Sequence, residues 1–131
     1  MIAWLSGKIA RIGEDHLILD VSGVGYLVFA SRATLSNLPK VGETYSLDIE
    51  TQVKEDSITL FGFGNSGEKD WFNLITKVQG VGAKVGLAIL GVLPPSELGR
   101  ALASGDKAAI TRAPGVGPKL AQRMISELKD K

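Results

Sequence analysis

Residues 75–84 read Ile-Thr-Lys-Val-Gln-Gly-Val-Gly-Ala-Lys, and residues 110–119 read Ile-Thr-Arg-Ala-Pro-Gly-Val-Gly-Pro-Lys. The two stretches align without a gap at an offset of 35 residues, and seven of the ten positions are identical or conservative. Self-similarity of this kind predicts one unit of supersecondary structure that the chain uses twice. The repeat therefore decides the fold of the second half of the sequence.

Each copy of the repeat predicts a helix, a Gly-Val-Gly turn and a second helix. Glycine permits unusual φ angles and close approach of a ligand, and we expect the valine to anchor the turn between the helices. The first N–H groups of a helix lack internal partners and lie at the positive end of its dipole, so they can bind an anion. A lysine in this first turn is unfavourable without such an anion, yet it occurs twice, as Lys84 and Lys119. The pattern favours two phosphate-binding turns over simple tight turns.

Hydrophobic spacing predicts a helical second half. A short flexible joint at residues 64–67 is expected to precede it, because Gly, Asn and Ser follow one another there. The expected helices are one around Phe72–Val78, one around Val85–Val92 that Pro94 stops, Ser96–Ser104, a short one from Asp106 to Ala113, and one from Pro118 onwards.

The first half has the two-residue period of β-strands. Tyr45, Leu47, Ile49, Thr51 and Val53 alternate with polar residues, as in a half-buried strand. The other expected strands are residues 2–12, Leu17–Val21, Gly25–Ala30 and Ile58–Phe63. Five short strands around a small core suggest an OB-fold barrel. The predicted class is α+β, with a five-stranded barrel at residues 1–63 and an all-α domain of two helix-hairpin-helix motifs at residues 64–131.

The composition excludes several classes of site. There is no cysteine, which removes disulfides and thiolate chemistry and fits a reducing compartment such as the cytoplasm. His16 is the single histidine and cannot form a metal site alone, so we expect no metal and no cofactor. It is expected to be a solvated turn residue. No stretch reaches the roughly 18 apolar residues of a membrane helix, so no membrane association is expected.

The charges are distributed unequally between the two halves. Residues 1–63 contain five Lys and Arg against eight Asp and Glu, a net charge of −3, whereas residues 64–131 contain ten against six, a net charge of +4. The second half is therefore the part that a polyanion would meet.

The repeated unit resembles the helix-hairpin-helix motif, which binds the DNA backbone without reading base sequence. The resemblance implies DNA contacts from the two turns and the lysines that follow them. These residues are Gly80, Val81, Gly82 and Lys84 in the first copy, and Gly115, Val116, Gly117 and Lys119 in the second. Arg123, one helical turn after Lys119, is a further expected contact, and its counterpart in the first copy is Ala88.

The whole chain resembles the RuvA family. The resemblance rests on the opening Met1–Gly7, on Val21–Tyr26 and Val53–Phe63, on the double hairpin, and on the final residues 127–131. It implies a homotetramer, with two tetramers as a further possibility, that holds an open four-way (Holliday) junction for branch migration in bacterial recombination and repair. It implies the ATPase RuvB and the resolvase RuvC as partners, and an acidic pin formed by Glu55 and Asp56.

Two features depart from the family. The third domain, through which the family reaches RuvB, is missing from this sequence, and the last predicted helix continues to the end of the chain without a stop signal. We therefore expect residues 1–131 not to couple to RuvB. Trp4 stands where a basic or polar residue is expected, and an exposed aromatic at the rim is the simplest interpretation.

Other functions fit the sequence less well. A DNA glycosylase needs a catalytic aspartate well beyond its hairpin, but only Asp130 follows the second copy. Neither turn matches the Gly-x-x-x-x-Gly-Lys-Ser/Thr loop of an ATPase, so no catalytic activity is expected. A single-strand-binding barrel would need a basic groove with stacking aromatics, whereas this barrel half is acidic. The alternative that remains open is a generic helix-hairpin-helix module for duplex or single-stranded DNA.

Overall fold

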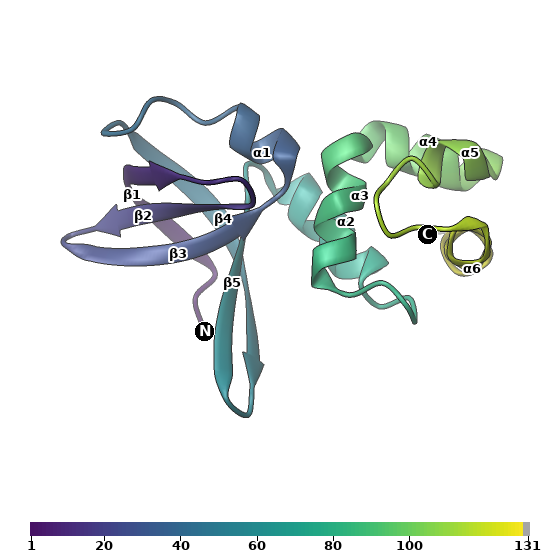
Figure 1. Ribbon diagram of the computed structural model, residues 1–131, viewed down its shortest axis with the longest axis horizontal. Helices are drawn as coiled ribbons and strands as arrows, with labels where there is room; N and C mark the ends of the chain where they lie inside the picture. The colour runs from purple at the N-terminus through teal and green to yellow at the C-terminus, as the bar shows by residue number, and fades with distance from the viewer. Residues whose placement is uncertain (130–131) are drawn as a thin grey trace. The chain divides into compact units, whose positions relative to one another are not determined.

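The computed structural model describes residues 1–129 of the chain (Figure 1). Asp130, which entered the glycosylase argument, and Lys131 lie outside the described residues. The structure contains two compact units, Met1–Lys69 and Asp70–Lys131. The first unit is a β-barrel and the second is helical, so the predicted α+β class is confirmed.

Five strands form the barrel, in the spatial order β1-β2-β3-β5-β4. They are β1 (Trp4–Ile12), β2 (His16–Val21), β3 (Val24–Ala30), β4 (Thr44–Lys54) and β5 (Ser57–Phe63). β4 pairs with β1 to close the barrel, and the pairing of β3 with β5 is the parallel one. Alternate side chains of these strands fill the interior. The buried core consists of Leu5, Ile9, Leu17, Leu19, Val28, Ala30, Leu47, Ile49 and Leu60.

The hairpin of β4 and β5 extends beyond the barrel as a two-stranded arm (Figure 1). Leu47, Ile49 and Thr51 are buried, as the alternation predicts, but Val53 is 59% exposed. Its cross-strand partner Ile58 is 70% exposed. The prediction that Val53 lies on the buried face of this strand was therefore wrong, because the strand continues past the layer of side chains that covers that face.

His16 and Trp4 occupy the barrel surface in different ways. His16 begins β2 instead of lying in the turn, so that prediction was wrong. Its Nδ1 lies 2.8 Å from Asp15 Oδ1, and its ring packs edge-on against Phe29. Trp4 is 59% exposed, as the simplest interpretation of the sequence expects.

A buried carboxylate organises the region around the short helix α1 (Arg32–Ser36). Glu68 accepts hydrogen bonds from Ser31 Oγ at 3.0 Å and Thr34 Oγ1 at 2.7 Å. Glu68 belongs to α2 (Ser66–Ile75), whose first turn is capped by Asn65 Oδ1, the acceptor for the Glu68 N–H. The flexible joint predicted at residues 64–67 was therefore wrong in its second half, because this capping starts a helix at Ser66.

Replacing Glu68 by alanine should lower the free energy of unfolding. The substitution leaves two buried hydroxyls without their acceptor, which costs about 2–3 kcal/mol. Urea unfolding followed by circular dichroism measures the change. Glu97→Ala is the matched control, since Glu97 also lies in the first turn of a helix but is exposed. An equal effect of the two substitutions would show that the buried hydrogen bonds do not contribute.

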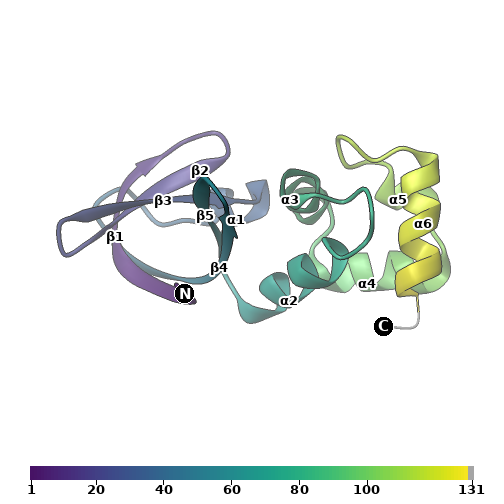
Figure 2. The same ribbon diagram turned by 90° about the horizontal axis from the view of Figure 1, so that it is seen from below.

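The second unit consists of most of α2 together with α3 (Ala83–Val92), α4 (Pro95–Ser104), α5 (Lys107–Ile110) and α6 (Pro118–Leu128), joined by short turns (Figure 2). The predicted helices are all present, but three end early. The last one, predicted to continue to the end of the chain, ends at Leu128. α2 stops at Ile75 and α5 at Ile110, so Val78 and Ala113 lie in the turns. Both remain buried, which explains why their spacing resembled helix.

In residues 1–129, no single helix is long and apolar enough to cross a membrane. Only α3 and α4 taken together reach that length and composition, across a bend of 96°.

Candidate nucleic-acid interface

The two repeated turns have the same backbone geometry. The Val81 N–H donates to the Val78 carbonyl at 3.0 Å, and the Val116 N–H donates to the Ala113 carbonyl at 3.1 Å. The first glycine of each copy has a positive φ, +99° at Gly80 and +88° at Gly115. Each is therefore a four-residue turn with glycine at its third position, as type II turns require.

The second glycine of each copy differs from the first. Gly82 has φ −82° and Gly117 has φ −92°, values that any residue adopts. The prediction of unusual φ angles was therefore right for the first glycines and wrong for the second ones. A Cβ atom built on Gly82 or Gly117 would have nothing within 4 Å. The space beside each second glycine is open to a ligand.

The first glycines instead face protein. A Cβ atom on Gly80 would lie 3.1 Å from Leu120 Cδ1, and one on Gly115 would lie 3.4 Å from Val85 Cγ2. Val85 and Leu120 are equivalent at the 35-residue offset, so the two hairpins pack against each other reciprocally. Sequence analysis predicted that a ligand could approach all four glycines closely. The structure leaves space for a ligand beside the second glycines, whereas the first glycines make room for the other hairpin.

The valines between the glycines anchor the turns, as predicted. Val81 is 3% exposed and Val116 is 6% exposed. Because their side chains are buried, any contact of these two residues with a ligand would have to come from their backbone.

The helices that follow the turns have bare N-termini. The N-cap residues Gly82 and Gly117 provide no side-chain hydrogen bond, and α3 and α6 have no acidic residue in their first turns. Every other helix in residues 1–129 has a side-chain cap or a first-turn acid. These residues are Ser31 for α1, Asn65 and Glu68 for α2, Glu97 for α4, and Asp106 for α5. The unmet N–H groups and positive dipole ends of α3 and α6 are therefore available to an anion.

Exposed cations accompany these helix ends. Lys84 lies in the first turn of α3 and Lys119 in the first turn of α6. The positive end of the helix dipole makes a cation unfavourable at both positions. Lys77 and Arg112, which sequence analysis did not single out, are also exposed and equivalent in the repeat. They follow the C-terminal ends of α2 and α5, where the helix dipole favours a cation. The dipole alone can therefore explain why both copies have a cation there, and the repetition is not evidence for a ligand.

Arg123 has a partner within the protein. Its Nη1 donates to the backbone carbonyl of Gln79 at 3.2 Å, across 44 residues of sequence. The Arg123 side chain of α6 therefore contacts the turn of the first hairpin. Ala88, its counterpart on α3, has no polar side chain that could make the equivalent contact.

The predicted pin residues form the tip of the barrel arm. Glu55 and Asp56 make the two-residue turn between Lys54 and Ser57, which pair across β4 and β5. Both acidic residues are exposed.

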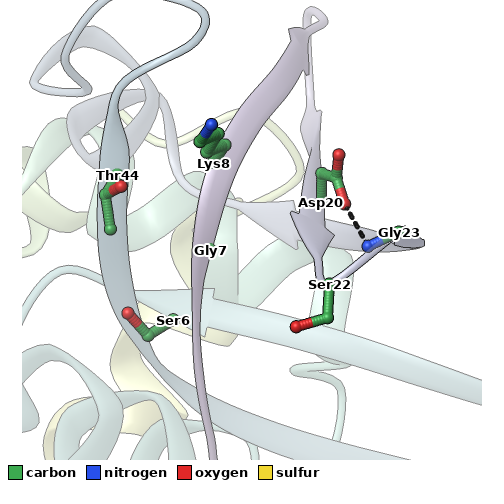
Figure 3. Close-up of a pocket in the computed structure, with 7 residues that line it drawn as sticks. All are labelled: Ser6, Gly7, Lys8, Asp20, Ser22, Gly23 and Thr44. Carbon is green, nitrogen blue, oxygen red and sulfur yellow. Dashed lines mark hydrogen bonds between the residues drawn. The ribbon is translucent and has the colours of Figure 1, made fainter.

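The barrel also has a hollow on its surface (Figure 3). It is lined by Ser6, Gly7, Lys8, Asp20, Ser22, Gly23 and Thr44. The Asp20 carboxylate accepts the Gly23 N–H at 2.7 Å, which stabilises the β2–β3 turn. The Asp20 carboxylate is thus used by the turn.

Comparison with known proteins identifies both units. The family model described as RuvA N terminal domain matches residues 1–62, and that described as SAM-like helix-hairpin-helix tandem matches residues 72–130. A protein of Beijerinckia indica is 60% identical over all 131 residues, and proteins of Afipia carboxidovorans and Methylobacterium radiotolerans are 58% and 56% identical over the same length. All three are RuvA proteins. The chain belongs to the RuvA family.

Membership in the RuvA family confirms the resemblance found in the sequence. The three relatives are each named as the RuvA subunit of a Holliday junction branch migration complex. This RuvA-family chain spans 64% of the length of each of them.

Proposed function

We propose that this chain binds four-way DNA junctions through their phosphates and holds them open for branch migration. The observation that carries the proposal is the pair of bare helix N-termini at α3 and α6, each with a lysine in its first turn. The names of the full-length relatives support the junction as the DNA structure concerned.

The two hairpins would each bind backbone phosphate. In α3 the donors would be first-turn N–H groups beside Gly82, with Lys84 as the cation. In α6, Pro118 has no N–H, so the donors begin at Lys119. These contacts neutralise phosphates without reading bases, so selectivity for a junction would depend on the shape of the DNA.

The chain would act as a non-catalytic subunit in recombination and repair. We propose that four copies surround one junction, in one or two tetramers, and that they work in the bacterial cytoplasm on chromosomal DNA. In the whole complex the ATPase RuvB would supply the motor and the resolvase RuvC would join, while residues 1–131 would contribute the DNA binding. Glu55 and Asp56 would form the pin near the crossover.

Comparing three DNA molecules tests the proposal. A four-way junction, a duplex and a single strand of matched length should bind in decreasing order of affinity, with the mass of each complex recorded. The junction complex should contain four protein chains or a multiple of four. Equal affinity for junction and duplex would favour the generic helix-hairpin-helix module instead.

Lys84→Ala and Lys119→Ala should each make DNA binding less dependent on salt. Each phosphate contact contributes roughly −0.9 to the slope of log affinity against log salt concentration, so the double variant should flatten the slope by about two such units. The change should be the same for DNA of different sequences. Lys40→Ala, which removes an exposed lysine of the barrel, serves as the control. An unchanged slope in the double variant would show that these lysines do not contact phosphate.

A further inference from the structure

The turns of the two hairpins differ at one position that controls their rigidity. Residues 78–81 read Val-Gln-Gly-Val, and residues 113–116 read Ala-Pro-Gly-Val. Proline fixes φ near −65°, the value that the second position of a type II turn requires. Pro114 therefore presets the second turn, whereas Gln79 leaves the first turn free to vary.

The freedom of the first turn resides in its central peptide group. Type I and type II turns differ mainly by rotation of the peptide that joins the second and third residues. In the first turn that peptide consists of the Gln79 carbonyl and the Gly80 N–H. A group that binds the Gln79 carbonyl therefore selects one orientation of the peptide, and with it the positive φ of Gly80.

Arg123 binds this carbonyl, with its Nη1 3.2 Å from the oxygen. Leu120, three residues earlier on α6, occupies the space beside Gly80. α6 thus binds the Gln79 carbonyl through a hydrogen bond from Arg123 and places Leu120 beside Gly80. The second hairpin has no equivalent brace from Ala88, but it has Pro114 in its place.

We propose that Arg123 is a positioning residue, which holds the turn of the first hairpin so that the N-terminus of α3 is presented to DNA. Pro114 restrains the second turn through φ of its second residue, whereas Arg123 restrains the first turn through its central peptide. The DNA part of this inference rests on the proposed function, whereas the bracing of the turn belongs to the free protein. A direct contact of Arg123 with phosphate, through its remaining N–H groups, is compatible with this role.

Three variants test the role of Arg123 in the protein without DNA: Arg123→Ala, Gln79→Pro and the two combined. Arg123→Ala should raise the amide hydrogen exchange rate of Val81, whose N–H closes the first turn on the Val78 carbonyl, about fivefold, as expected for the loss of one hydrogen bond. Adding Gln79→Pro should return the rate to that of the original chain, because it gives the first turn the Pro-Gly pair of the second. An unchanged rate in Arg123→Ala would overturn the proposal, even if the combined variant did not fold.

DNA binding provides the second measurement. Arg123→Ala should lower junction affinity about tenfold, and Gln79→Pro should recover a substantial part of that loss although it adds no charge. Lys119→Ala is the control on the same helix, and Gln79→Pro should not rescue it. No recovery in the Arg123→Ala background would show that the arginine acts only on phosphate. If the original chain bound no DNA, the proposed function would fail, while the exchange rates would still decide the bracing role.

Discussion

Gly82→Asp combined with Gly117→Asp should lower DNA affinity at least a hundredfold while leaving the protein as stable as before, or more so. Both positions are N-caps with extended backbone and open space around the missing Cβ. Aspartate is among the preferred N-cap residues, because its carboxylate accepts the free N–H groups of the first turn. The side chain that stabilises each helix would therefore occupy the position proposed for phosphate.

The size of the effect follows from electrostatics. Two unit charges 4 Å apart repel by about 1 kcal/mol in water and by about 4 kcal/mol near a protein surface. At the value near a protein surface, two such sites together exceed the roughly 2.8 kcal/mol that corresponds to a hundredfold, since about 1.4 kcal/mol is a factor of ten. The measurements are the dissociation constant for a four-way junction at one salt concentration and the midpoint of thermal unfolding.

A matched control separates the carboxylate from the added bulk. Gly82→Ala with Gly117→Ala places a methyl group in the same open space but offers the N–H groups no acceptor. This pair should change affinity much less than the aspartate pair. If the aspartate variant kept full affinity, the ends of α3 and α6 would not be the phosphate sites, and the bare N-termini would be a feature of the fold alone.

The sequence predicted the turns but not what surrounds them. The repeat located both Gly-Val-Gly turns because glycine and helix periodicity are local signals. It could not distinguish Gly80, which makes room for Leu120, from Gly82, which faces open space, since the distinction depends on a helix about 40 residues away. Arg123 is a similar case: its charge suggested phosphate, but its carbonyl partner lies in the other hairpin.

The barrel shows the same limit at two places. The alternation of β4 correctly placed Leu47 and Ile49 in the core, yet it continued through Val53, where no layer of side chains covers the strand. The period of a strand indicates which residues share a face, but it does not indicate where the side chains that pack on that face end. At residues 64–67 the Gly and Ser composition suggested a joint. The buried hydrogen bonds of Glu68 and the Asn65 cap prevailed over that local preference.

Glu55→Gln combined with Asp56→Asn should raise affinity for plain duplex and shrink the preference for junctions. The two carboxylates stand exposed at the tip of the arm, where they would repel any phosphate brought near. A continuous duplex that crosses the tip meets this repulsion, whereas strands that diverge around it avoid it. A repulsive element of this kind weakens total binding but improves discrimination.

The expected change is a fall in the ratio of duplex to junction dissociation constants of roughly fivefold to tenfold, from about 1–1.4 kcal/mol of relieved repulsion. Stability should change little, because exposed turn residues rarely affect the fold. Glu14→Gln with Asp15→Asn is the matched control: it neutralises another adjacent exposed pair, and asparagine keeps an oxygen for His16. If both pairs improved duplex binding equally, net charge would explain the effect. If the ratio stayed unchanged in the Glu55 and Asp56 variant, the pin would be only a turn, and junction selectivity would have to come from how the hairpins are arranged in the oligomer.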